Sequence, residues 1–443
     1  MNPSAALLFY GDDFTGATDA LGTAARAGLR TLLFLGTPDA KRLDSAGALD
    51  CIGIAGAARS MTPKAMRDEL APVAALARAL KPRVLHYKTC STFDSAPQVG
   101  SIGEAVRTLA PALGAPRLSI VGGQPNLGRY CLFGNLFATA GAQGEVFRID
   151  RHPTMSQHPV TPINEADLRL HLSRQGLKDI VLIPWTAYAE GDEALSLRAA
   201  KHSSPLLWDV AEPSHLALLG RQLWTLAQQE PLLAVGPSSV VEAVARAIHR
   251  EPAPRPRAIA AAEGPVLVLA GSLSPVTAAQ VAAASSTFEV MRLSAERLAS
   301  RDVDYLASAV LDAASQLASG RNVLACTVGI DGSRAAVPSG ALARAGGQLL
   351  KEVLRKTPAV RRVGIAGGDT SSLAVRALDA WALSYRGLLA PGVPLCRLHS
   401  DEALLDGVEL MLKGGQMGGP DVFERLIAGN QPGRDSTPCT LMP

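Results

Sequence analysis

Short apolar runs alternate with longer amphipathic segments along the first half of the chain. Two of the longer segments, residues 62–80 and 99–113, carry Ala and Leu at helical spacing. Such alternation is typical of βαβ units and predicts a mostly parallel sheet. The predicted strands are 6–10 (ALLFY), 31–35 (TLLFL), 51–55 (CIGIA), 84–88 (VLHYK), 118–122 (LSIVG) and 180–184 (IVLIP).

The pattern breaks at residues 250–264, REPAPRPRAIAAAEG, where closely spaced prolines exclude a helix and apolar periodicity is lost. We therefore predict two α/β domains with mostly parallel sheets, residues 1–250 and 262–443, joined by a linker over 251–261. The alternation resumes after the linker. Its predicted strands are 266–271 (VLVLAG), 288–293 (FEVMRL), 322–329 (NVLACTVG), 362–368 (RVGIAGG) and 408–413 (VELMLK).

Composition narrows the class of protein. Hydrophobic residues make up 47% of the 443 residues and aromatic residues only 4%, so the core is expected to be mostly Ala, Leu and Val. The net charge of +3 is too near neutral to indicate a nucleic-acid partner. Six cysteines without a CxxC pair argue against zinc and disulfides and favour a reducing cytosol. The chain shows no signal peptide and no long apolar stretch, so we expect a cytoplasmic protein without a membrane span.

Three predicted strands of the second half end in small residues. The strings are GSLSPVT from Gly271, AGGDTSS from Ala366 and LKGGQMGG from Leu412. Glycine lets a ligand approach the backbone, and a following helix N-terminus presents free N–H groups, so such loops bind phosphate well. Glycines that only form turns are the alternative for any single loop. The sequence has neither a GxxxxGK[ST] loop nor a clean GxGxxG after a strand.

Strand ends of the first half carry charge instead. Asp12 and Asp13 follow the first strand and Arg59 follows the third. The string HYKTCSTFDS (residues 86–95) spans the end of the fourth. Asn126 and Arg129 come after the fifth. These side chains suit a small, polyhydroxylated anion, whose carboxylate Arg would hold bidentately while an Asp takes a proton from the reacting hydroxyl.

Structural roles compete with the chemical ones. Asp13 is placed to cap a helix that begins near Thr15, so one of the two aspartates is expected to be structural. Asp94 would also serve as a cap or a turn residue. The segment RHPTMSQHPVTP (residues 151–162) holds two histidines among its prolines, and we interpret it as a rigid loop rather than a metal site.

Several rare strings occur in an order that resembles the four-carbon acid sugar kinase family over nearly the whole chain. YKTCSTFDS resembles the substrate motif of its 3-oxo-tetronate kinase branch, whereas the D-threonate kinase branch has a KTDSxxRG pattern there. Departures include Gly11 in place of a common Ala, GPSSVV (residues 236–241) in place of a glycine-rich string, and an extra His-Pro unit. The matching strings are GDDFTGATD, YKTCSTFDS, HPVTP, GSLSPVT, AGGDTSS, APGVPL and LKGGQMG.

The resemblance implies an ATP-dependent kinase that phosphorylates the terminal hydroxyl of a short sugar acid, with its active site in a cleft between the two domains. The candidate acids are 3-oxo-tetronate, D-threonate, erythronate and 3-oxo-isoapionate. The N-terminal domain would hold the acid through Asp12, Arg59, Lys88, Thr89, Cys90 and Ser91. The C-terminal domain would hold the nucleotide through Ser272, Gly367, Gly368, Asp369, Thr370, Gly414 and Gly415.

The resemblance also suggests why two aspartates are adjacent. One of Asp12 and Asp13 would orient or deprotonate the attacking hydroxyl, and the other would cap the helix or assist Mg²⁺ through water. Asp369 is the one side chain considered as a metal ligand. Two other functions stay open at this point, a dinucleotide-dependent oxidoreductase of a small hydroxy acid and a non-catalytic sugar-acid-binding protein. A homodimer is the default expectation for the assembly.

Overall fold

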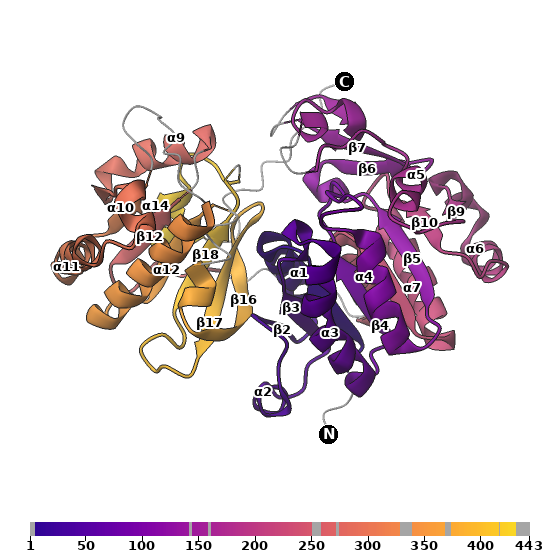
Figure 1. The fold of residues 1–443 in the computed structure, drawn as a ribbon, viewed down its shortest axis with the longest axis horizontal. Helices are drawn as coiled ribbons and strands as arrows, with labels where there is room; N and C mark the ends of the chain where they lie inside the picture. The colour runs from indigo at the N-terminus through magenta and orange to yellow at the C-terminus, as the bar shows by residue number, and fades with distance from the viewer. Residues whose placement is uncertain are drawn as a thin grey trace. The chain divides into compact units, whose positions relative to one another are not determined.

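The computed structural model describes residues 5–140, 144–157, 161–249, 258–271, 274–327, 339–367, 374–415 and 417–430 (Figure 1). The chain divides into two compact units, residues 1–254 and 255–443. Unit 1 and unit 2 are each built on their own set of strands, and each is described separately below.

Unit 1 contains a parallel sheet whose strands pair in the order β2-β3-β1-β4-β11-β5-β10-β9. The six strands predicted in this half are all present, and the sequence analysis missed β10 and β11. The bounds are β1 Leu7–Gly11, β2 Thr31–Phe34, β3 Cys51–Ala55, β4 Val84–Lys88, β5 Arg117–Gly122, β9 Val181–Ile183, β10 Leu206–Asp209 and β11 Leu232–Gly236.

Helices cover both faces of this sheet, which is why its strands are continuously apolar. Gly11 faces α1, where an added Cβ would lie 2.6 Å from the Cβ of Ala17. The preceding residue, Tyr10, points to the other face. Its hydroxyl donates a hydrogen bond to Glu69 of α3 (3.1 Å). The helices are α1 Phe14–Arg26, α2 Ala40–Ser45, α3 Pro63–Leu80, α4 Ile102–Leu109, α5 Leu168–Ser173, α6 Asp192–Ala200, α7 His215–Gln229 and α8 Ser239–Ile248.

The predicted helical segments of unit 1 are confirmed. Thr62 caps α3 by accepting a hydrogen bond from the N–H of Ala65, and Pro63 occupies the first turn. The segment 99–113 forms α4 followed by a 3₁₀ turn. The 3₁₀ turns of this unit are η1 Ala58–Ser60, η2 Ala110–Leu113, η3 Pro125–Leu127, η4 Ile149–Arg151, η5 Met155–Gln157 and η6 Trp185–Glu190.

A small antiparallel sheet, which the sequence analysis did not predict, follows β5 in unit 1. It consists of β6 (Arg129–Leu132), β7 (Asn135–Thr139) and β8 (Val146–Arg148). A tight turn at Phe133 and Gly134 joins the first two strands, and both residues have positive φ. Asp209, at the end of β10, accepts hydrogen bonds from both of their N–H groups.

Unit 2 has a sheet in the order β13-β14-β12-β15-β18-β17-β16. The first five strands are parallel, and all five were predicted. The last two are antiparallel and were missed, because the short turn at Gly392 links them as a hairpin instead of a βαβ unit. The bounds are β12 Val266–Ala270, β13 Glu289–Arg292, β14 Val323–Cys326, β15 Arg362–Ala366, β16 Ala380–Ala390, β17 Val393–Ser400 and β18 Glu409–Lys413.

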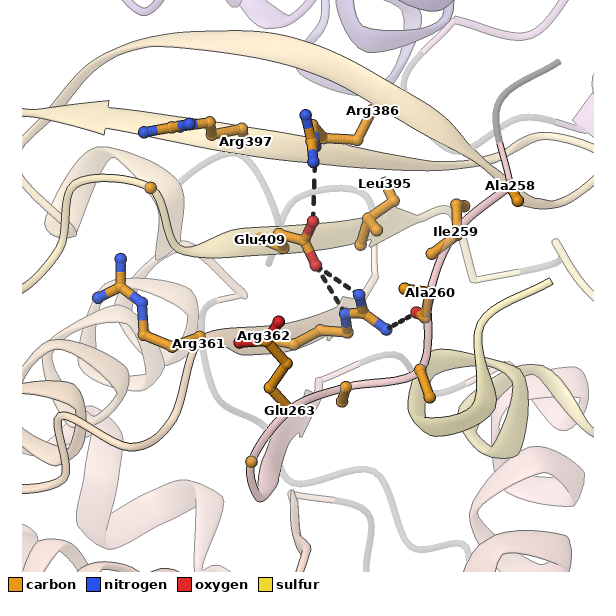
Figure 2. A pocket seen from close by; sticks show the side chains of 14 residues that line it. Ala258, Ile259, Ala260, Glu263, Arg361, Arg362, Arg386, Leu395, Arg397 and Glu409 are labelled. Carbon is orange, nitrogen blue, oxygen red and sulfur yellow. Dashed lines mark hydrogen bonds and ion pairs between the residues drawn. The ribbon is translucent and has the colours of Figure 1, made fainter. Parts of the chain in front are cut away.

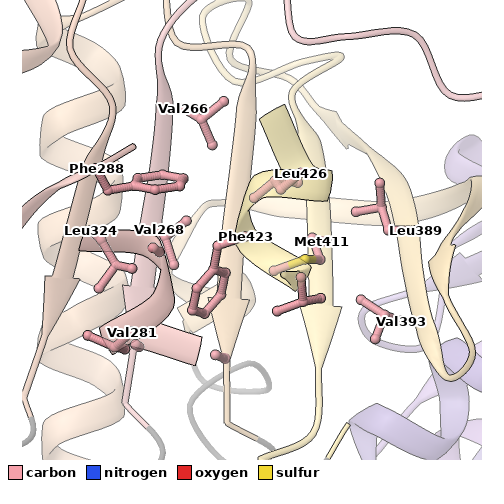
Figure 3. Close-up of a cluster of buried hydrophobic side chains, with 14 of the residues drawn as sticks. Val266, Val268, Val281, Phe288, Leu324, Leu389, Val393, Met411, Phe423 and Leu426 are labelled. Carbon is pink, nitrogen blue, oxygen red and sulfur yellow. The ribbon is translucent and has the colours of Figure 1, made fainter. Parts of the chain in front are cut away.

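One buried core cluster of unit 2 lies between this sheet and helices α9 and α14 (Figure 3). Phe423 and Leu426 of α14 pack beside Val266 and Val268 of β12. Leu269, one residue further along β12, points to the opposite face, towards Gly346 of α12. The helices are α9 Pro275–Ala283, α10 Ala295–Ala299, α11 Val303–Ala318, α12 Ser339–Lys356 and α14 Val422–Ala428, with the 3₁₀ turn η7 Ala284–Ser286.

The predicted linker is only partly described. Residues 251–257 lie outside the described residues. Ile259 forms a β-bridge with Asn430 and belongs to the buried core of unit 2, so the chain is already part of that unit at this point.

Candidate functional site

Three neighbouring strands of unit 1 end together at the carboxyl edge of its sheet. Gly11 of β1 is in register with Lys88 of β4, and Lys88 is in register with Gly236 of β11. Asp12 follows directly, and its N–H donates to the carbonyl of Lys88 (3.0 Å). The carbonyl of Asp12 accepts from the N–H of Arg59 (3.1 Å), which lies in η1 after β3. The sheet thus brings together residues that are far apart in the chain, from Gly11 to Gly236.

Asp13 is the N-cap of α1, and its side chain accepts a hydrogen bond from the N–H of Gly16 (3.1 Å). The predicted capping role is therefore confirmed, although the helix begins at Phe14. Asp13 does more than cap the helix. Its two oxygens also pair with the ammonium of Lys88 (3.4 Å) and the guanidinium of Arg59 (3.3 Å).

Gly16 is required by this arrangement. A Cβ at this position would lie 1.6 Å from Nζ of Lys88 and 2.3 Å from Oδ1 of Asp13. The glycine of the GDDFTGA string therefore leaves room for the ion pair. Sequence reasoning gave this glycine no role.

The two adjacent carboxylates have opposite pKa shifts. Burial opposes ionisation of Asp13, but Lys88 and Arg59 outweigh it and hold the pKa of Asp13 below its usual range. Burial, followed by the charge of Asp13, raises the pKa of Asp12 to about 7. Divergent pKa values in a carboxylate pair are typical of sites that carry out acid–base chemistry.

The polar partners of Asp12 are few. Its Oδ2 accepts a hydrogen bond from the hydroxyl of Thr89 (3.2 Å). Its Oδ1 is buried and has no hydrogen-bond partner within the described part of the chain. A buried carboxylate oxygen without a partner is costly. This oxygen is therefore an unsatisfied hydrogen-bond acceptor within the described part of this edge.

The other predicted residues of this edge lie in the loop after β4. Cys90 and Ser91 are half-buried, and Sγ of Cys90 lies 3.0 Å from the hydroxyl of Thr92. Thr92 in turn donates to Asp94 (2.6 Å), whose other oxygen is 4.0 Å from Arg59. Phe93, between them, is buried with φ of 57°, a strained conformation of the kind that recurs at functional loops.

Two residues at this edge were missed by the sequence analysis. The amide of Gln124, just beyond β5, donates to Asp19 of α1 (3.0 Å). Asp19 in turn helps to raise the pKa of Lys88. The sequence feature that could have indicated Asp19 is its charge, because it lies among small and apolar residues of a helix. Gln124 has the same strand-end position as the predicted residues.

Two histidines of the predicted site segments, His86 and His152, make structural hydrogen bonds. His86 is buried within β4, its Nε2 is 2.9 Å from the carbonyl of Gly236, and burial lowers its pKa to about 3. Nδ1 of His152 accepts hydrogen bonds from the N–H groups of Thr154 and Met155. His152 therefore organises its own loop, as the sequence predicted. His158 lies outside the described residues.

Glycines gather at the corresponding edge of unit 2. Strands β12, β15 and β18 are neighbours, with Ala270 in register with Ala366 and Ala366 in register with Lys413. Gly271, Gly367 and Gly414, which follow these three residues, therefore lie side by side. Gly415 is the next residue of the same loop. Ser272, Gly368, Asp369 and Thr370 were also predicted to bind the nucleotide, and they lie outside the described residues.

Side chains of α9 fix the loop that follows β18. Ser274 and Thr277 both donate hydrogen bonds to the carbonyl of Gly415, and Ser274 also caps the helix. The buried amide of Gln280 lies 3.0–3.1 Å from the carbonyls of Met417, Gly418 and Gly419. The loop carbonyls are thus engaged by the helix. This leaves the ammonium of Lys413, which donates to Thr277 (3.2 Å), as the charged group of this edge among the described residues.

A cavity of about 380 Å³ lies elsewhere in unit 2 (Figure 2). Arg362 and Glu409, which line it, are the first residues of β15 and β18, so it lies at the amino ends of these strands. They form an ion pair of 2.6 Å. The cavity contains none of the residues that the sequence predicted for a site.

Comparisons with known proteins add to this geometry. Residues 7–244 match the family model described as a sugar-binding N-terminal domain, and residues 267–423 match the one described as a nucleotide-binding C-terminal domain. The chain is 39% identical to a 3-oxo-isoapionate kinase of Paraburkholderia graminis, over 96% of this chain and 95% of that protein. The chain belongs to the four-carbon acid sugar kinase family.

A second relative of this family is a 3-oxo-tetronate kinase of Methylobacterium radiotolerans, 31% identical over 96% of this chain and 99% of that protein. Among solved structures, one from Salmonella typhimurium LT2 has a TM-score of 0.78 at 22% identity, covering 95% of this chain and 98% of that one. At this identity the structural likeness supports the fold alone.

Family membership decides between the functions that the sequence left open. The protein is a sugar-acid kinase, so the oxidoreductase and the non-catalytic binding protein are set aside. Within the described residues, no helix is both long enough and apolar enough to cross a membrane.

Proposed function

We propose that this kinase transfers the terminal phosphoryl group of ATP to the terminal hydroxyl of a short 3-oxo sugar acid. The named activities of the relatives support this choice, and the 39% identity to a 3-oxo-isoapionate kinase puts that acid first. The acid 3-oxo-tetronate comes second, because the relatives of that name are 28–32% identical. D-threonate and erythronate belong in the same panel of candidates.

The observation that carries the mechanism is the unpartnered Oδ1 of Asp12, buried beside an ionised carboxylate. We assign Asp12 as the general base, with Oδ1 accepting the proton of the attacking hydroxyl. Thr89 holds the other oxygen and fixes the orientation of the carboxylate. A base with a pKa near 7 is matched to neutral pH. Asp13 contributes its charge and the position of Lys88.

Arg59 is the proposed clamp for the carboxylate of the acid. Nη1 of Arg59 approaches Asp13 (3.3 Å) and Asp94 (4.0 Å), and 34% of its side chain is exposed, so part of the guanidinium fork is open to a ligand. A planar fork suits bidentate binding of a carboxylate. We propose that Lys88, Cys90 and Ser91 line the remainder of the acid site.

Unit 2 is the proposed nucleotide site. Gly367, Gly414 and Gly415 would bring backbone N–H groups close to phosphate oxygens. We propose the same role for Ser272, Gly368 and Thr370, with Asp369 as a metal ligand. Bound ATP would supply the phosphoryl group, and Mg²⁺ would screen the charge on its phosphate oxygens.

A coupled ADP-release assay tests this function. Purified enzyme, ATP and Mg²⁺ are combined with each acid of the panel, and release is compared with a reaction that lacks the acid. We expect acid-dependent ADP release, with the highest kcat/KM for a 3-oxo acid, and loss of release in excess EDTA. Release with none of the acids would refute the proposal.

A further inference from the structure

The side chain of Lys413 is almost completely buried at the nucleotide edge of unit 2. It is the last residue of β18, and its side chain is 1% exposed. Its carbonyl accepts a hydrogen bond from the N–H of Gly367 (2.9 Å), so it lies where β15 and β18 both end. The same chain end continues into Gly414 and Gly415. Lys413 therefore lies between two of the glycine turns to which we assign phosphate binding.

The ammonium of Lys413 is held by a hydrogen bond, but no acidic side chain of the described residues neutralises its charge. It donates to the hydroxyl of Thr277 (3.2 Å), and the proton of that hydroxyl is directed at the carbonyl of Gly415 (3.0 Å). Within the described residues, no carboxylate forms an ion pair with Lys413. Burial lowers the pKa of Lys413 to about 8, and no titratable group in that part of the chain counters the shift.

Such an arrangement weakens the folded protein. Burying an ammonium without a counter-ion is unfavourable, and a hydrophobic side chain of similar length would avoid that cost. The surrounding loop is nevertheless built to keep its carbonyls occupied, because Ser274, Thr277 and Gln280 all donate to them. Among the described residues, this edge has no anion to pair with Lys413.

We propose that Lys413 is the phosphate-binding cation of the nucleotide site, and that its ammonium pairs with a phosphate oxygen of ATP or ADP. The inference rests on the proposed nucleotide role of unit 2. Thr277 is then a positioning residue, which holds the ammonium towards the glycine turns. The nucleotide supplies a counter-charge that the described residues do not provide.

The first test is the Lys413→Met variant, with Lys356→Met as the matched control. Lys356 is an exposed lysine of the same unit, at the end of α12. ATP, adenosine and tripolyphosphate are titrated by calorimetry, and melting temperatures are measured without ligand. For Lys413→Met we expect ATP and tripolyphosphate to bind roughly 10- to 100-fold more weakly, the usual effect of losing a hydrogen bond to a charged group.

Adenosine affinity is expected to stay at its wild-type value, because adenosine has no phosphate. The ligand-free melting temperature should stay the same or rise. Unchanged ATP affinity would overturn the proposal. So would an equal loss of ATP and adenosine affinity accompanied by a lower melting temperature, because that pattern indicates a purely structural lysine. Wild-type enzyme that binds no nucleotide would instead overturn the proposed function.

The wild-type protein provides a second test that needs no variant. At pH 8.5 much of the ligand-free Lys413 is neutral, because its pKa is about 8. A bound phosphate raises that pKa, so tripolyphosphate should bind with net proton uptake. Titrations in buffers of different ionisation enthalpy measure the uptake. Binding without proton uptake at this pH would overturn the proposed pairing.

Discussion

The carboxyl edges of the two sheets hold buried positive charge in opposite ways. In unit 1, Lys88 and Arg59 contact Asp13, and Arg59 also approaches Asp94. In unit 2, Lys413 is as deeply buried as Lys88, but its ammonium donates to a hydroxyl and pairs with no carboxylate among the described residues. Among the described residues, the cations of the first edge have carboxylate partners and the cation of the second edge has none.

This difference in charge indicates which kind of ligand each edge is suited to bind. A balanced edge gains little from a highly charged ligand, but its fixed dipoles and one unpartnered carboxylate oxygen suit a ligand with several hydroxyls and a single charge. An unbalanced ammonium beside glycine turns suits a polyanion, because the ligand removes a cost that the fold already carries. The contrast agrees with a sugar acid in unit 1 and nucleotide phosphates in unit 2.

The largest expected effect is that of Asp12→Asn. Asn keeps the size of the side chain and can still accept the hydrogen bond of Thr89, but it cannot accept a proton. We expect kcat to fall by about 10²–10⁴-fold, the usual contribution of a positioned general base. The melting temperature, as control, should stay the same or rise, because a buried carboxylate is removed. An Asp12→Asn enzyme with wild-type kcat would end the general-base assignment.

The next largest expected effect is on protein stability, and it compares the two buried lysines, Lys88 and Lys413. Lys88→Met should destabilise the protein by about 3–5 kcal/mol, because it breaks a buried ion pair and leaves Asp13 short of a counter-ion. Lys413→Met should be neutral or stabilising. The free energies of unfolding of both variants are measured with the same denaturant and without ligand. Equal destabilisation by the two substitutions would remove the contrast between the edges.

Arg59→Lys is expected to act on substrate binding. Lysine keeps the charge but loses the planar fork, so KM for the acid should rise roughly 10- to 100-fold. KM for ATP should change little, which serves as the internal control. Equal increases in both KM values would mean that Arg59 does not act on the acid alone.

Sequence patterns could predict much of this because parallel strands place their carboxyl ends together. Asp12 and Arg59 follow predicted strands and Lys88 is the last residue of one, so their convergence needed no knowledge of strand order. The neighbourhood of Lys88 was not predictable, since β11 comes 144 residues later in the chain and pairs beside β4. Strand order across a sheet depends on tertiary packing, which local periodicity does not encode.

The details of protonation were also beyond the sequence. The sequence alone does not distinguish two adjacent aspartates. The structure shows that Asp13 contacts two cations, whereas one oxygen of Asp12 has no hydrogen-bond partner within the described chain. Lys413 is part of the LKGGQMGG string, but nothing in that string indicates that its ammonium is buried with no carboxylate partner among the described residues. Burial and counter-charge arise from segments that are distant in sequence.

The smallest effect, a shift in pH dependence, tests how closely the two aspartates are linked. Asp12 must be ionised to act as a base, so kcat/KM should fall as the pH drops below its pKa of about 7. The charge of Asp13 contributes to that raised pKa. Asp13→Asn removes this charge and retains the helix cap. The positive charges of Lys88 and Arg59 then act on Asp12 without the opposing charge of Asp13, so the pKa of Asp12 should fall. The acid limb of the kcat/KM profile should therefore move to lower pH. A limb that stays in place or moves to higher pH would show that it belongs to another group, because loss of a neighbouring negative charge cannot raise the pKa of a carboxylate.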